Sequence, residues 1–474
     1  MPEPDARTQV ARSVRVLAEW AYGLSWRLVP QRVADRLRTV VFDMLTVNAI
    51  GARTAEQRAI RTVWPTPPGR APVVAGGVRT DAVTAAHLNA QATVCLELDE
   101  GNKYAKGHPA AHCVPAILAL AAELDATGAD TLAALLVGYE VAARFGRATS
   151  LRPGTHPHGN WGIAGAAAGC ARLLGLDAEG IAAAIDAGSG LPIAGHFTSA
   201  LDGNPVRDAW LGAANTAGLT AARLARAGVA RNTGTAALSL GGLLGSFDPA
   251  ELTDQLGDRF DVEHNYFKQH ASCGYTHPVA DLAMAVRAEL FPGASPAEIA
   301  AQVSEIRVDT HSLAAGLDRP TWDSPLAAMF SIPFVAAAAL LDGVVSPESA
   351  RQRPEQAPEL AATAARVRVA EDTGLTARLP AHRANRLTVT LAGGRSHTSE
   401  TENPLGDSDF HPFDRATLAD LLTRQFGGDR GPVDAVWRIV DGLADSAAVS
   451  ATLGALADIP DHAEHAENEE AEDR

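Results

Sequence analysis

Cysteine, aromatic residues and positive charge are all scarce in this chain of 474 residues. Its four cysteines form no CxxC pair and no spacing typical of a zinc finger. The N-terminus lacks a basic segment followed by an apolar signal core. The sequence therefore predicts a cytoplasmic protein with free thiols.

The charge balance is acidic, with 40 Lys and Arg against 56 Asp and Glu. Surfaces that bind nucleic acid or anionic membranes are usually basic, so neither partner is expected. Glu123, Arg172 and Asp342 interrupt the longest apolar stretches before they reach the length that spans a bilayer. No membrane-spanning segment is expected.

The segment 461–474 holds seven acidic residues and one arginine, or a net charge of -6 out of the total of -16. It contains few apolar residues, so we expect a disordered tail. Over the whole chain, hydrophobic residues make up 46% and aromatic residues only 5%, so alanine, leucine and valine must form most of the core.

Apolar residues repeat at helical spacing through the first half and change to alternating or β-branched patterns after about residue 260. The expected helices cover 14–26, 33–50, 81–96, 114–126, 131–145, 162–174, 279–290, 334–341, 418–426 and 433–443. The expected strands cover 303–309, 365–370 and 386–391, with a hairpin turn at 392–395. The predicted fold is mainly α, with a large all-helical domain (1–265), a smaller α+β domain (266–405) and helices that return to the first domain (406–460).

The segment 162–171, GIAGAAAGCA, consists mostly of glycine and alanine. Such small side chains allow backbones to approach closely, so we expect a central helix with near neighbours. The alternative is that the segment only reflects the high alanine content of the chain.

The most unusual segment, 97–112, reads ELDEGNKYAKGHPAAH and combines three carboxylates, two lysines and two histidines between apolar stretches. His108 and His112 could share one helix face and bind zinc, but Pro109 and the missing third ligand argue against a metal site. A solvated polar loop is a second alternative. We favour a catalytic or substrate-binding loop that leads into a helix starting near Ala110.

A second polar segment, THPHGNWG at 155–162, also runs directly into an apolar helix. Helix N-termini offer free backbone amides, so two such junctions could hold carboxylates while the histidines transfer protons. Structural histidines are the alternative. In a third segment, GNPVRDAWLGAAN at 203–215, Arg207 either binds a carboxylate or pairs with Asp202 or Asp208.

The fourth segment, YFKQHASCGYTHP at 266–278, lies at the expected domain boundary, where active-site clefts often form. Cys273 with His270 or His277 could form a thiol nucleophile, but no sequence feature indicates a lowered thiol pKa. Lys268 and Tyr275 add further polar groups.

In order and spacing, these segments resemble the MmgE/PrpD family of 2-methylcitrate dehydratases, cis-aconitate decarboxylases and dicarboxylate epimerases. The opening helices correspond to LAEWAYGLSWRLVPQRVADRLRTVVFDMLTVNAIG at 17–51. The later signatures correspond to ELDEGNKYAKGHPAAHCVPAILAL, HPHGNWGIAGAAAG, RDAWLGAAN, KQHASCGYTHPVADLA and FVAAAALLDG. The resemblance covers most of the chain.

The resemblance implies a helical domain with a small α+β lid, a homodimer, a small di- or tricarboxylate substrate, and no metal, iron–sulfur cluster or organic cofactor. By correspondence, the catalytic residues would be His108, His156, Lys268 and Cys273. The substrate-binding residues would be Glu97, Asp99, Lys103, His158, Arg207 and His277.

Three positions distinguish the chain from the cis-aconitate decarboxylases. Gly101 stands where those relatives carry threonine, Phe334 where they carry tyrosine, and Cys273 where they carry histidine and dehydratases usually carry cysteine. We therefore expect a hydro-lyase that dehydrates a 2-methylcitrate-like substrate by acid–base chemistry. The alternatives are an epimerase that transfers an α-proton, a decarboxylase of specialised metabolism, and a binding protein without catalysis.

Overall fold

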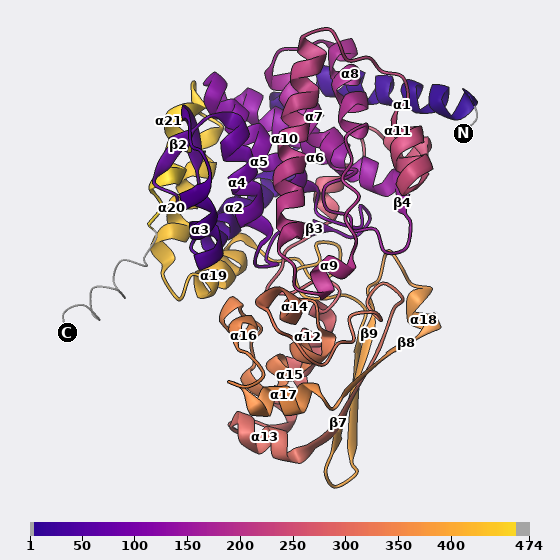
Figure 1. Ribbon diagram of the computed structural model, residues 1–474, viewed down its shortest axis with the longest axis vertical. Helices are drawn as coiled ribbons and strands as arrows, with labels where there is room; N and C mark the ends of the chain where they lie inside the picture. Colours follow the sequence, from indigo (N-terminus) through magenta and orange to yellow (C-terminus); the bar gives the residue numbers. More distant parts are fainter. Residues whose placement is uncertain (1–3, 461–474) are drawn as a thin grey trace, which may run out of the picture.

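The computed structural model describes residues 4–460 (Figure 1). Helices dominate this range, so the predicted mainly α class is confirmed. The disorder expected at 461–474 falls outside the described residues. None of the helices in 4–460 is both long and apolar enough to cross a bilayer.

The first half of the chain forms a packed group of helices, drawn in indigo to magenta in Figure 1. These are α1 (Pro4–Gly23), α2 (Gln31–Ala52), α3 (Ala55–Val63), α4 (Ala82–Val94), α5 (Pro109–Leu124), α6 (Gly128–Ala148), α7 (Ile163–Leu173), α8 (Ala178–Ser189), α9 (Thr198–Leu201), α10 (Val206–Arg226) and α11 (Ala236–Leu238). Short 3-10 or π turns are η1 (Trp26–Leu28), η2 (Ser239–Leu244), η3 (Pro249–Leu252), η4 (Asp261–His264) and η5 (Ala455–Asp458).

The first 265 residues are not purely helical, which corrects the expectation of an all-helical domain. Short strands form three antiparallel pairs, β1 (Pro68–Val73) with β2 (Val78–Thr80), β3 (Gly101–Asn102) with β6 (Asn265–Tyr266), and β4 (Thr149–Leu151) with β5 (Gly245–Phe247). Five of these six strands have only two or three residues, too few to show a period of two, and two of the pairs join segments about 100 residues or more apart.

The α7 helix lies at the centre of the helical group, as its small residues predicted, and its residues 163–171 are all buried. A Cβ atom on Gly165 would lie 2.3 Å from the carbonyl oxygen of Gly138 on α6. A Cβ atom on Gly169 would lie 2.3 Å from Cδ1 of Ile117 on α5. The glycines therefore let α5, α6 and α7 pack at close range.

The next part of the chain, drawn in orange at the lower end of Figure 1, combines helices with a four-stranded sheet of order β10-β9-β7-β8. The strands are β7 (Val303–Thr310), β8 (Val367–Glu371), β9 (Asn385–Leu391) and β10 (Ser396–Thr401). Only the β7–β8 pair is parallel. The three predicted strands and the hairpin turn after β9 are confirmed. The helices are α12 (His277–Leu290), α13 (Pro296–Gln302), α14 (Pro325–Met329), α15 (Ile332–Asp342), α16 (Pro347–Arg351), α17 (Pro358–Ala364) and α18 (Thr373–Thr376).

The last described helices are α19 (Arg415–Gln425), α20 (Arg430–Leu443) and α21 (Val449–Gly454), drawn in yellow in Figure 1. They contact α2, α5 and β1, far away in the sequence. Trp437 on α20 stacks on Phe42 of α2 with ring centroids 3.9 Å apart. The segment 402–414 therefore crosses from the sheet back to the first helices.

Candidate active site

A cavity of about 620 Å³ lies where the loops before α5 and α7 meet the start of α10 and the segment before α12. Six of the ten site residues predicted from the sequence line it, namely Glu97, His108, His156, His158, Arg207 and Cys273. The structure thus brings together residues from four separate segments of the sequence.

His108 is the N-cap residue of α5 and lies on the wall of the cavity. Its Nδ1 atom is 2.7 Å from the Glu100 carbonyl oxygen and 2.9 Å from Oδ2 of Asp99. Burial alone would raise the pKa of Asp99, but the charges of His108 and Lys268 outweigh it and lower that pKa. The Nδ1 side of His108 is therefore held by the Glu100 carbonyl oxygen with the ionised carboxylate of Asp99 beside it, and Nε2 is the nitrogen left for chemistry.

Glu97 connects two buried cations. Its backbone has φ of +52°, and its carboxylate accepts hydrogen bonds from the Arg207 guanidinium and, at 2.9 Å, from Nζ of Lys268. Burial would raise the pKa of Glu97, but Arg207 and Lys268 lower it. Lys268 also lies 3.4 Å from Asp99 and is not part of the cavity wall. The catalytic role expected for Lys268 stays a prediction, and its observed position is a contact with these two carboxylates.

Glu100 faces a different environment from Glu97. The Tyr139 hydroxyl donates to Oε1 of Glu100 at 2.6 Å, and Oε2 has no hydrogen-bond partner among the described residues. Burial raises the pKa of Glu100 to about 8. Burial and the nearby Glu100 also raise the pKa of Asp43, so both side chains favour the neutral form.

His156 and His158 lie just before α7, and both are buried. The backbone N–H of His158 donates to Nδ1 of His156 at 3.0 Å, so neutral His156 must carry its proton on Nε2. Burial lowers the pKa of both histidines well below the ordinary value. The rings of His108 and His158 meet edge to face with centroids 5.3 Å apart.

His112 is a structural residue. Its Nδ1 atom lies 2.8 Å from the His108 carbonyl oxygen, and its Nε2 atom accepts the N–H of Gly159 at 3.1 Å. Both ring nitrogens are occupied, so His108 and His112 cannot act as a pair of metal ligands. Within the described residues, no group of three or more His, Cys, Asp or Glu side chains is arranged to hold a metal ion.

Three of the predicted substrate-binding residues do not line the cavity: Asp99, which contacts His108, and also Lys103 and His277. Lys103 is buried and contacts Asp407 at 3.0 Å and Asp409 at 2.9 Å. His277 is the first residue of α12, with Nε2 3.2 Å from the Ser272 carbonyl oxygen. Neither lines the cavity, because internal partners hold both side chains in the fold.

Cys273 lines the cavity, and its backbone N–H donates to the Met329 carbonyl oxygen at 2.9 Å. Burial, with the negative charge of Glu97, raises the pKa of its thiol to about 11. The thiol is therefore protonated near neutral pH, which argues against a thiolate nucleophile.

The cavity wall also holds large side chains that were not among the ten predicted site residues, including Tyr266, Tyr275, Phe330 and Arg383. The two tyrosines belong to the segment singled out at 266–278. No signal marked Arg383, which is one of many arginines in a region of loops and strands.

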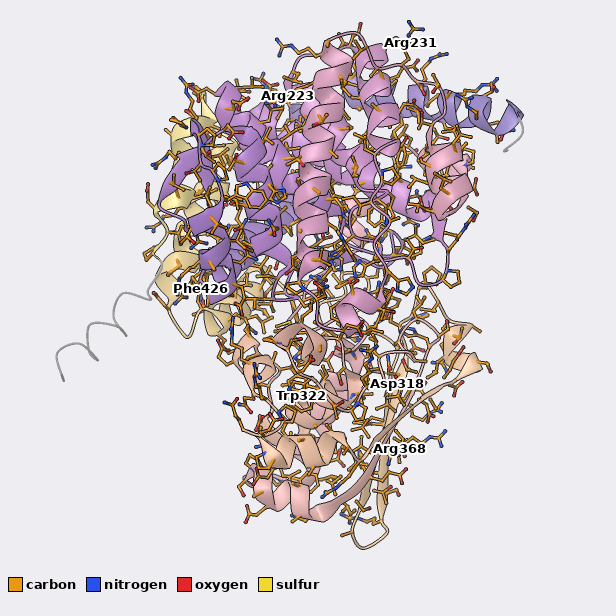
Figure 2. All side chains as sticks on the ribbon, viewed as in Figure 1. Arg223, Arg231, Asp318, Trp322, Arg368 and Phe426 are labelled. Atoms are coloured by element: carbon orange, nitrogen blue, oxygen red, sulfur yellow. The ribbon has the colours of Figure 1, made fainter. Side chains whose placement is uncertain are left out.

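The structure also shows the surroundings of Gly101 and Phe334, two of the positions that distinguish the chain from the cis-aconitate decarboxylases. A Cβ atom on Gly101 would lie 2.3 Å from the hydroxyl of Tyr266, so the tyrosine occupies the space that a side chain at 101 would need. Phe334 lies in the core rather than on the cavity wall, and its ring meets Trp322 edge to face at 4.9 Å. Figure 2 shows Trp322 among the side chains of the lower helices. Phe330, four residues earlier and between α14 and α15, lines the cavity instead.

Comparison with known proteins matches nearly the whole described chain. Residues 15–248 match the MmgE/PrpD N-terminal domain and residues 270–423 match the MmgE/PrpD C-terminal domain. A cis-aconitate decarboxylase of Aspergillus terreus is 25% identical over 438 residues, covering 86% of this chain and 89% of the relative. A cis-aconitate decarboxylase of Mus musculus is 27% identical over 379 residues, covering 72% of each chain.

The two domain matches together span well over half of the sequence, and they contain every residue described above on the cavity wall except Tyr266. The chain belongs to the MmgE/PrpD family.

Proposed function

We propose that this protein is a lyase that acts on a small di- or tricarboxylate by acid–base chemistry at a carbon next to a carboxylate. The observation that carries the proposal is the contact, at 2.9 Å, between His108 on the cavity wall and the buried carboxylate of Asp99. A carboxylate on Nδ1 orients the ring and stabilises the imidazolium that forms when Nε2 accepts a proton. The curated relatives named above are also lyases.

In the proposed reaction, Nε2 of His108 removes the proton from the carbon next to a substrate carboxylate. His156, neutral and protonated on Nε2, donates a hydrogen bond to the oxygen that gains negative charge, as a neutral imidazole can. The C–O bond to a hydroxyl group on the adjacent carbon then breaks, a C=C bond forms, and the proton leaves with the hydroxide as water. Such acid–base help is typically worth about 100- to 10,000-fold in rate.

Dehydration is the favoured reaction because of the surroundings of Gly101. Tyr266 fills the space beside Gly101. The cis-aconitate decarboxylases of the family carry threonine at the position of Gly101. The cavity of this chain is therefore shaped differently at that position, which supports a substrate other than cis-aconitate.

Decarboxylation is the second candidate, and the names of the relatives favour it. In that reaction the C–C bond to a carboxylate breaks, carbon dioxide leaves, and protonated His108 delivers a proton to the carbon. The same residues would serve both reactions, so the substrate decides between them.

Proton NMR in deuterium oxide distinguishes these reactions. The EDTA-treated protein is incubated with 2-methylcitrate, citrate, malate, cis-aconitate and iminodisuccinate in turn. New olefin signals from a hydroxy acid would support dehydration, and loss of carbon dioxide from cis-aconitate would support decarboxylation. Deuterium exchange at the α-carbon without either change would favour an epimerase and contradict the proposal.

The variants His108→Ala and His156→Ala link the chemistry to the site. We expect turnover to fall by at least about 100-fold in each, with the circular dichroism spectrum and melting temperature little changed. His196→Ala is a matched control, because this histidine also lines the cavity but is exposed. Rates near those of the parent protein in His108→Ala would contradict the assigned role.

We also propose that the protein works as a cytoplasmic homodimer, in which residues 266–405 form a lid on the helical part. This proposal rests on the family resemblance. Light scattering of the purified protein would give the mass of one chain or of two.

A further inference from the structure

The buried cations near the reacting groups are already neutralised by the chain itself. Arg207 donates to the carboxylates of Glu97 and Asp208 and to the Val94 carbonyl oxygen. Lys268 contacts Glu97 and Asp99. Neither cation brings a net positive charge to an anionic substrate.

Arg383 differs from both of these cations. It lies between α18 and β9, lines the cavity, and is only 4% exposed. Its guanidinium carbon is 4.7 Å from the ring centre of Tyr266 and 5.2 Å from that of Tyr275. Within residues 4–460, no carboxylate oxygen lies within the 4.0 Å that defines an ion pair with Arg383. The charge of the more distant Asp407 also acts on Arg383, but that carboxylate is already paired with Lys103. A buried cation without a counter-charge is costly, unless a bound anion supplies that charge.

The flanking tyrosines suit the same ligand. Burial raises the pKa of Tyr266, and it raises that of Tyr275 to about 12. Both hydroxyls are therefore neutral near pH 7 and able to donate hydrogen bonds. The Cζ and hydroxyl of Tyr266 also lie against Gly101 and Gly274, so the ring is held in place from two sides.

We propose that Arg383, flanked by Tyr266 and Tyr275, binds a second carboxylate of the substrate, away from the carbon on which His108 acts. This inference rests on the proposed function and names the residue that holds the second carboxylate of that substrate. The planar guanidinium can donate two parallel hydrogen bonds to one carboxylate, which a lysine cannot do. Arg383 thus decides specificity, whereas His108 carries out the chemistry.

Calorimetric binding of propane-1,2,3-tricarboxylate tests the proposal. This probe has neither a hydroxyl group nor a double bond, so it can be bound without dehydration. We expect Arg383→Gln to weaken its binding by about 10- to 100-fold, and to change the binding of butyrate, a monocarboxylate, much less. The affinity of Arg383→Lys for the probe should lie between that of the parent protein and that of Arg383→Gln.

Arg386→Gln is the matched control. Arg386 lies three residues further along, outside the cavity, and already pairs with Asp372 and Glu400. Its replacement should leave the affinity for the probe within about twofold. Unchanged affinity in Arg383→Gln, or no binding of the probe by the parent protein, would overturn the inference.

Chemical rescue distinguishes a binding role of Arg383 from a purely structural role. Added guanidinium ion should restore part of the binding in Arg383→Ala if the missing charge is the cause. A lowered melting temperature without rescue would overturn the proposal. If probe binding depends on Arg383 but no substrate of the panel is turned over, only the proposed function is contradicted. If a substrate is turned over but Arg383→Gln leaves probe binding unchanged, only this inference is contradicted.

Discussion

Single residues of the same type behave differently in this site because their neighbours differ. Glu97 and Glu100 are both buried and lie three positions apart. Two cations lower the pKa of Glu97, whereas burial, together with the negative charge of Asp99, raises that of Glu100. Glu97 is thus an ionised anchor for Arg207 and Lys268, and Glu100 is a neutral hydrogen-bonding group at neutral pH.

The raised pKa of Glu100 predicts how stability depends on pH. Protonated Glu100 favours the folded state, so its contribution is complete below the ordinary value of 4.5 and is lost as the pH rises through about 8. Glu100→Gln keeps a neutral side chain at every pH. Its free energy of unfolding, measured with urea, should therefore decline less than that of the parent protein between about pH 5 and pH 9. An equal decline in both proteins would contradict the neutral assignment of Glu100.

At the scale of secondary-structure elements, two loop-to-helix junctions bring the histidines together. His108 caps α5, and His156 and His158 precede α7. The two helices contact each other, and both contact α6. The glycines of α7 set how closely these helices approach, and this approach sets the distance between the histidine rings.

Gly165→Ala tests the packing of α7. The added Cβ atom would lie 2.3 Å from a backbone oxygen of α6 and 2.6 Å from Cβ of Ala142, so one helix must shift. We expect the free energy of unfolding to fall by about 1–3 kcal/mol, with turnover reduced as well. Gly442→Ala on α20 is the control, because no atom lies within 4 Å of its added Cβ. That variant should gain up to about 1 kcal/mol by helix propensity. If the free energy of unfolding of Gly165→Ala is not lower than that of Gly442→Ala, the close packing of α7 is contradicted.

At the scale of the whole molecule, Lys103 joins distant parts of the chain. It follows β3 in the first half of the sequence and contacts Asp407 and Asp409 in the segment that leads from β10 to α19. His264 also contacts Asp409, at 2.8 Å. Lys103, predicted as a substrate ligand, does not line the cavity, and its ion pairs connect the segment after β3 to the segment before α19.

Lys103→Met should destabilise the whole molecule, because it leaves Asp407 buried without its counter-charge. Breaking a buried pair on one side typically costs about 3–5 kcal/mol, whereas replacing both partners by apolar residues costs far less. We therefore expect the double variant Lys103→Met, Asp407→Leu to recover much of the loss in urea unfolding. Arg415→Met is the surface control, since its pair with Asp441 is exposed and should contribute about 1 kcal/mol or less. A single variant as stable as the double variant would contradict this account.

The mainly α class, most long helices and the strands β7, β8 and β9 were predictable from the sequence. Hydrophobic periodicity is a local property, and it is strong in long elements. The short pairs such as β3 with β6 were not predictable, because each depends on contacts between segments that are distant in the chain. The segment around His108 was also visible from sequence, since so many charged residues rarely interrupt apolar helices.

The sequence by itself determined which residue types could carry the chemistry, namely the histidines, carboxylates and cations of four short segments. Only the tertiary structure decided which of them face the cavity and in which ionisation state. Lys103, Lys268 and Arg383 are all cations in the sequence. The first two are neutralised by carboxylates that the fold brings to them, whereas Arg383 meets two tyrosines. Charge compensation depends on distances of a few ångströms between segments far apart in the chain, and local sequence carries no information about those distances.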